Sequence, residues 1–80
     1  MELRGREVLV LGIGESGTAA ARLLVREGAQ VRCSDGGAGP EVRRRAAALE
    51  KIGCRVEFGG HTADFSRGVS LAVQSPGIDP

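Results

Sequence analysis

The sequence predicts a small α/β domain in which a parallel sheet lies between two layers of helices. Four short apolar segments alternate with segments of helical periodicity, and no linker or low-complexity stretch interrupts them. Parallel strands need crossover connections, which helices usually provide. A glycine-rich turn follows the first apolar segment directly, as at the junction of a buried strand with the next helix. We therefore expect a three-layer, doubly wound domain.

The four expected strands differ in their pattern. Residues 7–12 (EVLVLG) contain a run of four aliphatic side chains that ends at a glycine, which indicates a strand buried on both faces. Gln30–Asp35 (QVRCSD) places its two apolar side chains on one side. The third strand is expected at residues 54–58 (CRVEF), which alternate, and the fourth at residues 69–74 (VSLAVQ).

Two longer helices are expected between these strands. Residues 16–27 are rich in alanine and leucine and carry a polar stripe at a spacing of four residues, and Gly28 ends the helix. Residues 41–52 repeat apolar side chains at i, i+4 and i+7. Pro40 suits the first position of this second helix, and Gly53 ends it.

The order of the elements sets the expected topology. With one helical turn at residues 63–68, a strand follows each helix, which calls for right-handed crossovers and a sheet in the order 3-2-1-4. The chain halts after residues 77–78 in what reads as a connection, and its fourth strand would be an unprotected edge. We expect residues 1–80 to form one Rossmann-like domain that lacks its last strand and belongs to a longer protein.

Composition excludes several functional classes. Hydrophobic residues make up 41% of the chain and charged residues 26%, and the net charge of +1 provides no basic surface for nucleic acid. No apolar run approaches the ~20 residues of a membrane helix, and no signal-peptide pattern follows Met1. We expect a cytoplasmic protein that binds neither nucleic acid nor membranes. Cys33 and Cys54 lack the spacing of a metal or redox site and are interpreted as reduced core residues.

The turn after the first strand matches G-x-G-x-x-G, with Gly12, Gly14 and Gly17 at the three glycine positions. The first glycine permits a tight turn, the second lets backbone approach a pyrophosphate, and the third lets helix and strand pack closely. Free N–H groups at the helix N-terminus, together with the helix dipole, then bind the phosphates. Ser16 could add a hydroxyl donor or cap the helix. The Glu15 carboxylate would repel a pyrophosphate, so we expect it to face solvent.

Two further segments should converge on this turn. Asp35 ends the second strand 18 residues after Gly17, close to the spacing at which an acidic residue meets a ribose hydroxyl. Its carboxylate could accept a hydrogen bond from ribose or from a base such as uracil, and the alternative is an Asx turn. Ser75, Pro76 and Gly77 follow the fourth strand, which the predicted order places across the topological switch point. Three loops would then line one site.

No catalytic constellation is visible. His61 has no cysteine, carboxylate pair or second histidine at metal-ligand spacing, so we interpret it as a loop residue with a structural hydrogen bond. Arg43, Arg44 and Arg45 could form a phosphate-binding patch, but a solvated helix face is favoured because they lie opposite the buried stripe. The P-loop motif G-x-x-x-x-G-K-[ST] is absent. We expect no catalytic residue, no metal site and no activity from this segment alone.

The motifs together resemble a known family. The run VLVLGIGESGTAAARLL, the strand that ends at Asp35, the GGH triplet and the VQSPGIDP segment occur in the order found in the N-terminal domain of the Mur ligases. The resemblance covers nearly the whole chain and is strongest to the D-glutamate-adding branch. It implies a domain that binds the UDP part of UDP-N-acetylmuramoyl-L-alanine rather than NAD.

The same resemblance implies how the whole enzyme works. A central domain would bind ATP and Mg²⁺, and a third domain would bring the amino acid. The substrate carboxylate would be activated as an acyl phosphate and attacked by the amine of D-glutamate, in peptidoglycan biosynthesis. The UDP contacts that the resemblance implies lie in three loops: Gly12, Gly14, Glu15, Ser16 and Gly17; Asp35 and Gly36; and Ser75, Pro76 and Gly77. Because glycines follow Asp35, base contacts there would come from the backbone.

Two other functions fit the same residues. The NAD(P)-binding half of an oxidoreductase would use the same glycine loop and acidic residue. A non-enzymatic nucleotide-sensing module would bind a ligand and relay a movement. The segment 75–78 (SPGI) favours the ligase, because the dinucleotide fingerprint does not require it.

Overall fold

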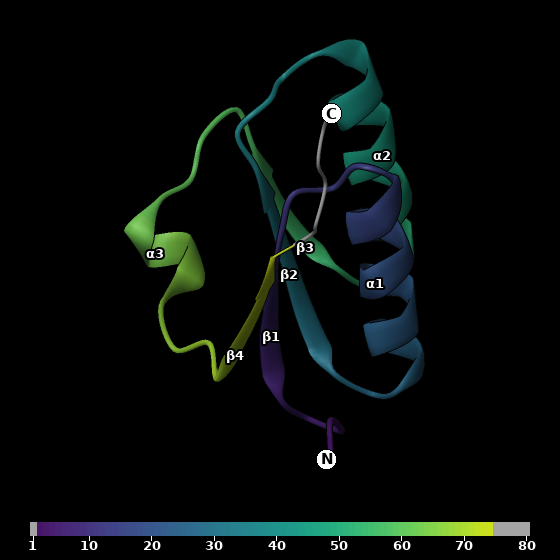
Figure 1. Cartoon of the computed structure of the whole chain (residues 1–80), viewed down its shortest axis with the longest axis vertical. Helices are drawn as coiled ribbons and strands as arrows, with labels where there is room; N and C mark the ends of the chain where they lie inside the picture. The colour runs from purple at the N-terminus through teal and green to yellow at the C-terminus, as the bar shows by residue number, and fades with distance from the viewer. Residues whose placement is uncertain (1, 75–80) are drawn as a thin grey trace.

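The computed structural model describes residues 2–74, whose arrangement Figure 1 shows. Within these residues, four parallel strands form one sheet in the order β3-β2-β1-β4, which confirms the predicted order. In chain order the strands are β1 (Glu7–Leu11), β2 (Gln30–Asp35), β3 (Arg55–Phe58) and β4 (Leu71–Gln74). The strand β1 is central, with β2 on one side and β4 on the other.

Helices lie on both faces of the sheet, so the three predicted layers are present. The helices α1 (Glu15–Arg26) and α2 (Pro40–Lys51) cover one face, and the single turn α3 (Ala63–Ser66) lies on the opposite side (Figure 1). Each long helix follows a strand and returns the chain to the start of the next one. Within the described part of the chain, no helix is long and apolar enough to cross a membrane.

Two strands begin later than the sequence predicts, and hydrogen bonds explain both shifts. The N–H of Cys54 donates to the carbonyl of Leu49 at 3.0 Å, which completes the C-terminal turn of α2 and leaves Cys54 outside β3. The N–H of Val69 donates to the carbonyl of Ser66 at 3.3 Å, so the chain is still turning there when β4 was expected to have begun.

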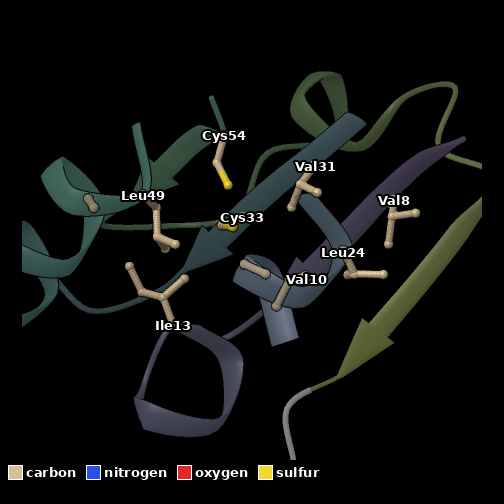
Figure 2. Packing of buried hydrophobic residues seen from close by; sticks show 10 residues of the cluster. Val8, Val10, Ile13, Leu24, Val31, Cys33, Leu49 and Cys54 are labelled. Carbon is tan, nitrogen blue, oxygen red and sulfur yellow. The ribbon is translucent and has the colours of Figure 1, made fainter. Parts of the chain in front are cut away.

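The hydrophobic core lies between the sheet and the two long helices (Figure 2). The strand β1 is buried on both faces, since none of the residues 8–10 is more than 6% exposed. In the sheet Val8 stands opposite Val31, and Val10 stands opposite Cys33. Packed against this apolar face are the residues Ile13, Ala21, Leu24, Ala46, Leu49 and Cys54. Ile13 belongs to the glycine-rich turn and is buried in the core, so the core and the turn are in direct contact.

On the opposite face of the sheet, Arg32 lies beside Leu9 and bonds to the segments that cover this face. Its Nη1 donates to the carbonyls of Phe65 and Arg67 at 2.9 and 2.7 Å, and its Nη2 forms an ion pair with Glu7 at 3.0 Å. The Arg32 side chain is 11% exposed. Hydrogen bonds to charged donors are stronger than those between neutral groups. Arg32 therefore fixes α3 and its flanking loops against the sheet.

Cys33 and Cys54 are free and buried, as the sequence predicts for core residues. Figure 2 shows both side chains within the core. A hydrogen bond with Cys54, reinforced by burial, raises the pKa of the Cys33 thiol. Cys33 therefore stays protonated and packs as a small apolar side chain.

Candidate functional site

The candidate site lies at the carboxyl ends of β1 and β2, where the glycine-rich turn leads into α1. Gly12 has a φ of +92°, a left-handed conformation that glycine adopts without steric cost. Its N–H donates to the carbonyl of Ser34 at 2.8 Å, which extends the pairing of β1 with β2 by one bond. The chain can therefore turn sharply at the edge of the sheet, as the first glycine of the motif requires.

The helix α1 begins without a side-chain cap. Gly14 is the N-cap residue, and no side chain among the described residues accepts a hydrogen bond from this end of the helix. The first four N–H groups of a helix have no partner inside the helix. Gly14, Glu15 and Ser16 are exposed, whereas Gly17 is buried. The first turn of α1 thus opens to solvent with its backbone donors.

Three sequence expectations for this turn can be compared with the structure. Glu15 is exposed, as the sequence predicts. Gly17 is buried, which fits the close packing of helix and sheet that the third glycine permits. Ser16 does not cap the helix, so that alternative is wrong. The side chain that does bond to the turn is that of Thr18, whose Oγ1 donates a hydrogen bond to the carbonyl of Ile13 at 3.1 Å.

Asp35 joins the glycine-rich turn to the loop after β2. Its Oδ2 accepts a hydrogen bond from the N–H of Ile13 at 2.8 Å, and its Oδ1 accepts one from the N–H of Gly37 at 2.8 Å. The second bond is the Asx turn that the sequence offered as an alternative. The first bond, to a residue 22 positions away, was not predicted. Contact of Asp35 with a ligand stays a prediction.

The loop that follows Asp35 is tied to the loop after β3. The N–H of Gly59 donates to the carbonyl of Gly37 at 2.8 Å. A Cβ added at Gly37 would lie 3.2 Å from both the Asp35 carboxylate and Val42, so a side chain there would displace one of them. Hydrogen bonds therefore connect the loops that follow β1, β2 and β3: Asp35 bonds the first two loops, and Gly37 bonds the last two.

His61 makes the structural hydrogen bond that the sequence suggested. Its Nδ1 lies 2.6 Å from the Oγ of Ser34, which is 2% exposed. This hydrogen bond gives the buried Ser34 hydroxyl a partner and ties the loop after β3 to the end of β2. The Nε2 lies 3.5 Å from a Cβ built on Gly36. The ring therefore fills the space beside Gly36 that a side chain at that position would use.

The three arginines of α2 do not share one environment. Arg44 is 69% exposed and pairs with Glu41 at 2.6 Å, as expected for a solvated helix face. Arg45 is only 27% exposed, pairs with Glu41 at 3.0 Å, and directs Nη1 at the carbonyl of Ile13, 3.4 Å away. The prediction of a solvated face is therefore wrong for Arg45. The sequence could have indicated this, because Arg45 is three residues after Val42 and four before Leu49 and so borders the buried stripe of the helix.

The described residues bring together two of the three predicted loops. The glycine-rich turn and the Asp35–Gly36 segment are joined by the bond from Ile13 to Asp35. Ser75, Pro76 and Gly77 lie outside the described residues. The strand before them, β4, pairs with β1 so that Gln74 stands opposite Leu11. Among residues 2–74 there is no cluster of three His, Cys, Asp or Glu side chains that could hold a metal ion.

Asp35→Ala should lower the free energy of unfolding by about 1–3 kcal/mol, because two backbone N–H groups lose their acceptor. Urea denaturation measures this change. Asp64→Ala is the matched control, since Asp64 is 84% exposed and pairs only with Arg67 in the described structure. Exposed pairs of this kind contribute about 0–1 kcal/mol. Equal stability of the two variants, with unchanged hydrogen exchange at Ile13, would contradict the joining role of Asp35.

Comparison with solved structures shows the same fold in two oxidoreductases. The chain superposes on the precorrin-2 dehydrogenase SirC with a TM-score of 0.66 and 24% identity, covering 92% of this chain and 36% of that one. It superposes on the bacillithiol disulfide reductase Bdr of Bacillus cereus with a TM-score of 0.72 and 22% identity, covering 98% and 31%. At such identities the likeness concerns the fold alone.

Sequence comparison is more specific. The ligase named UDP-N-acetylmuramoylalanine--D-glutamate ligase from Acidobacterium capsulatum is 46% identical over 78 residues, which are 98% of this chain and 17% of that protein. The ligase of the same name from Thermobifida fusca is 44% identical over 80 residues, 100% of this chain and 17% of that protein. The chain thus spans about a sixth of the length of these relatives.

A family model described as the Mur ligase MurD-like N-terminal domain matches residues 6–80. The match includes the glycine-rich turn, the strand that ends at Asp35 and the loops that Asp35 joins. The chain therefore belongs to the family of MurD-like Mur ligase N-terminal domains.

Proposed function

We propose that this domain binds the UDP part of UDP-N-acetylmuramoyl-L-alanine, with the diphosphate at the start of α1. The observation that carries the proposal is the open, uncapped first turn of α1 in a chain that belongs to this ligase family. Exposed Gly14 gives a phosphate room to approach the backbone. The N–H groups of residues 14–17 and the positive end of the helix dipole supply the attraction.

Asp35 and Gly36 would contact the uracil or the ribose. Each Asp35 oxygen already accepts one backbone hydrogen bond. An ionised carboxylate has about four acceptor positions, so Asp35 can accept another from a ribose hydroxyl or a base N–H. Gly36 is exposed and would offer only its backbone. Ser75, Pro76 and Gly77 complete the proposed site on the phosphate and sugar side.

The chemistry of the reaction would lie elsewhere in the parent protein. We propose a cytoplasmic, ATP-dependent ligase of peptidoglycan biosynthesis that joins D-glutamate to the substrate carboxylate. ATP and Mg²⁺ would be held by a central domain and D-glutamate by a third. The part played by this domain is to hold the nucleotide end of the substrate so that its distant carboxylate reaches the reacting groups. The domain alone is expected to catalyse nothing.

Titration with separate ligands distinguishes this proposal from the oxidoreductase alternative. We expect UDP and UDP-N-acetylmuramoyl-L-alanine to shift the amide signals of Gly14, Ser16 and Gly17 in NMR spectra, because these N–H groups would bind the diphosphate. The sugar and peptide contacts belong to other domains, so the titration is carried to millimolar concentration. If NAD shifted these signals and UDP did not, the domain would instead be the NAD(P)-binding half of an oxidoreductase.

Gly14→Val should abolish the response to UDP while the domain still folds. Gly14 has φ −66° and ψ −163°, which valine can adopt, and an added Cβ would lie 3.7 Å from Arg45 in ordinary contact. The new side chain would keep the phosphates from the backbone, so we expect affinity to fall by about tenfold or more.

Gly39→Val is the matched control for that variant. Gly39 is the N-cap of α2, has φ −75° and ψ 177°, and has open space around an added Cβ. It carries the same substitution in the same type of position away from the proposed site. We expect UDP affinity to stay within about twofold of that of the unaltered chain. Retained UDP binding in a folded Gly14→Val domain would place the phosphates elsewhere.

A further inference from the structure

Arg45 is the one arginine of the described α2 that turns toward the glycine-rich turn. Arg45 lies on α2, whereas the turn leads into α1, and the two helices form one layer (Figure 1). Its Nη1 lies 3.4 Å from the carbonyl oxygen of Ile13 and 3.7 Å from a Cβ built on Gly14. The guanidinium is therefore next to the residue whose missing side chain would admit a phosphate.

The charges around the turn leave this guanidinium available to an anion. Glu41 is the carboxylate paired with Arg45, but it also pairs with Arg44 at 2.6 Å. One negative charge is thus shared between two guanidinium groups. Counting Arg43 as well, three arginines and one glutamate leave two positive charges on this end of α2. The glycine-rich turn contributes the negative charge of Glu15, and Asp35, which is bonded to Ile13, adds a second one.

The contacts that Arg45 makes are easily exchanged. A separation of 3.4 Å between Nη1 and the Ile13 oxygen is longer than the usual 2.7–3.2 Å of an N–H···O bond, so this bond is weak. The Glu41 pair is an i, i+4 pair on a half-exposed carboxylate. A diphosphate carries more charge than one carboxylate and matches the planar fork of an arginine. Small rotations of the side chain would bring the fork to it.

We propose that Arg45 binds the diphosphate from the α2 side, opposite the N–H groups of α1, and so sets the preference of this site for a nucleoside diphosphate over a nucleoside. The inference rests on the proposed function and adds a side chain to a site that otherwise offers backbone donors. It also explains how a turn that contains Glu15 can accept a dianion: Arg45 offsets that charge.

Arg45→Gln and Arg44→Gln test this role as a matched pair. Both variants remove one positive charge and one ion pair to Glu41, but only the first removes a group next to Gly14. UDP and uridine are titrated separately by NMR up to millimolar concentration. We expect Arg45→Gln to weaken UDP binding about tenfold and Arg44→Gln to change it less than about twofold. Neither variant should alter the response to uridine, which has no phosphate.

Several results would overturn the proposal. Equal losses in the two variants would show a bulk charge effect, and unchanged UDP affinity in Arg45→Gln would show that Arg45 does not touch the diphosphate. A parallel loss for uridine would assign Arg45 a purely structural role. Arg45→Lys covers the case in which the glutamine variant does not fold. It keeps the charge but loses the fork, so its loss of UDP affinity should be larger than the twofold limit set for Arg44→Gln and smaller than about tenfold.

The same titration separates this inference from the function on which it rests. If the unaltered chain binds no UDP at millimolar concentration, the proposed function itself fails, and Arg45 has no diphosphate to bind. If the unaltered chain binds UDP through the amides of residues 14–17 and Arg45→Gln binds it equally well, only the role of Arg45 fails.

Discussion

The candidate site depends on the two hydrogen bonds that the Asp35 carboxylate accepts. One oxygen holds the N–H of Ile13 and the other holds the N–H of Gly37, so two loops that follow different strands are fixed by one side chain. Through Gly37 and Gly59 the loop after β3 is fixed as well. Ile13 is also 1% exposed and packed in the core. The glycine-rich turn is thus fixed both by the packing of Ile13 in the core and by its hydrogen bond to Asp35. Its conformation is therefore defined before any ligand binds.

The N-termini of α1 and α2 lie in the same layer and differ in the donors that they offer to a ligand. Both α1 and α2 begin at a glycine without a side-chain cap, so the missing cap alone does not mark a ligand site. They differ in their first residues. The helix α2 begins with Pro40, which has no N–H to donate, and its Arg43 donates to the nearby carbonyl of Ala38. The helix α1 keeps its first-turn donors beside the Asp35-anchored loops and the Arg45 guanidinium.

Most of the fold was predictable because the local sequence patterns of the strands, helices and turns agree with the observed topology. Periodicity and glycines located all seven elements of the described residues, and alternation of strands with helices was enough to predict the strand order. Strand starts were missed at Cys54 and Val69, where the backbone hydrogen bonds back to a preceding turn. In the site, spacing singled out the glycines and Asp35. The contacts of Asp35 with Ile13, Ser34 with His61 and Arg45 with Ile13 each join residues more than 20 positions apart, and only the packed structure brings them together.

A crystal structure of the domain with UDP tests the central claim most directly, because it locates both phosphorus atoms relative to the Asp35-anchored turn. The account predicts diphosphate oxygens within hydrogen-bonding distance of backbone nitrogens in residues 14–17. It also predicts that Asp35 still accepts from Ile13, since the turn is already formed without ligand. A diphosphate bound away from the first turn of α1, or a turn that rearranges and breaks the bond from Ile13 to Asp35, would contradict it.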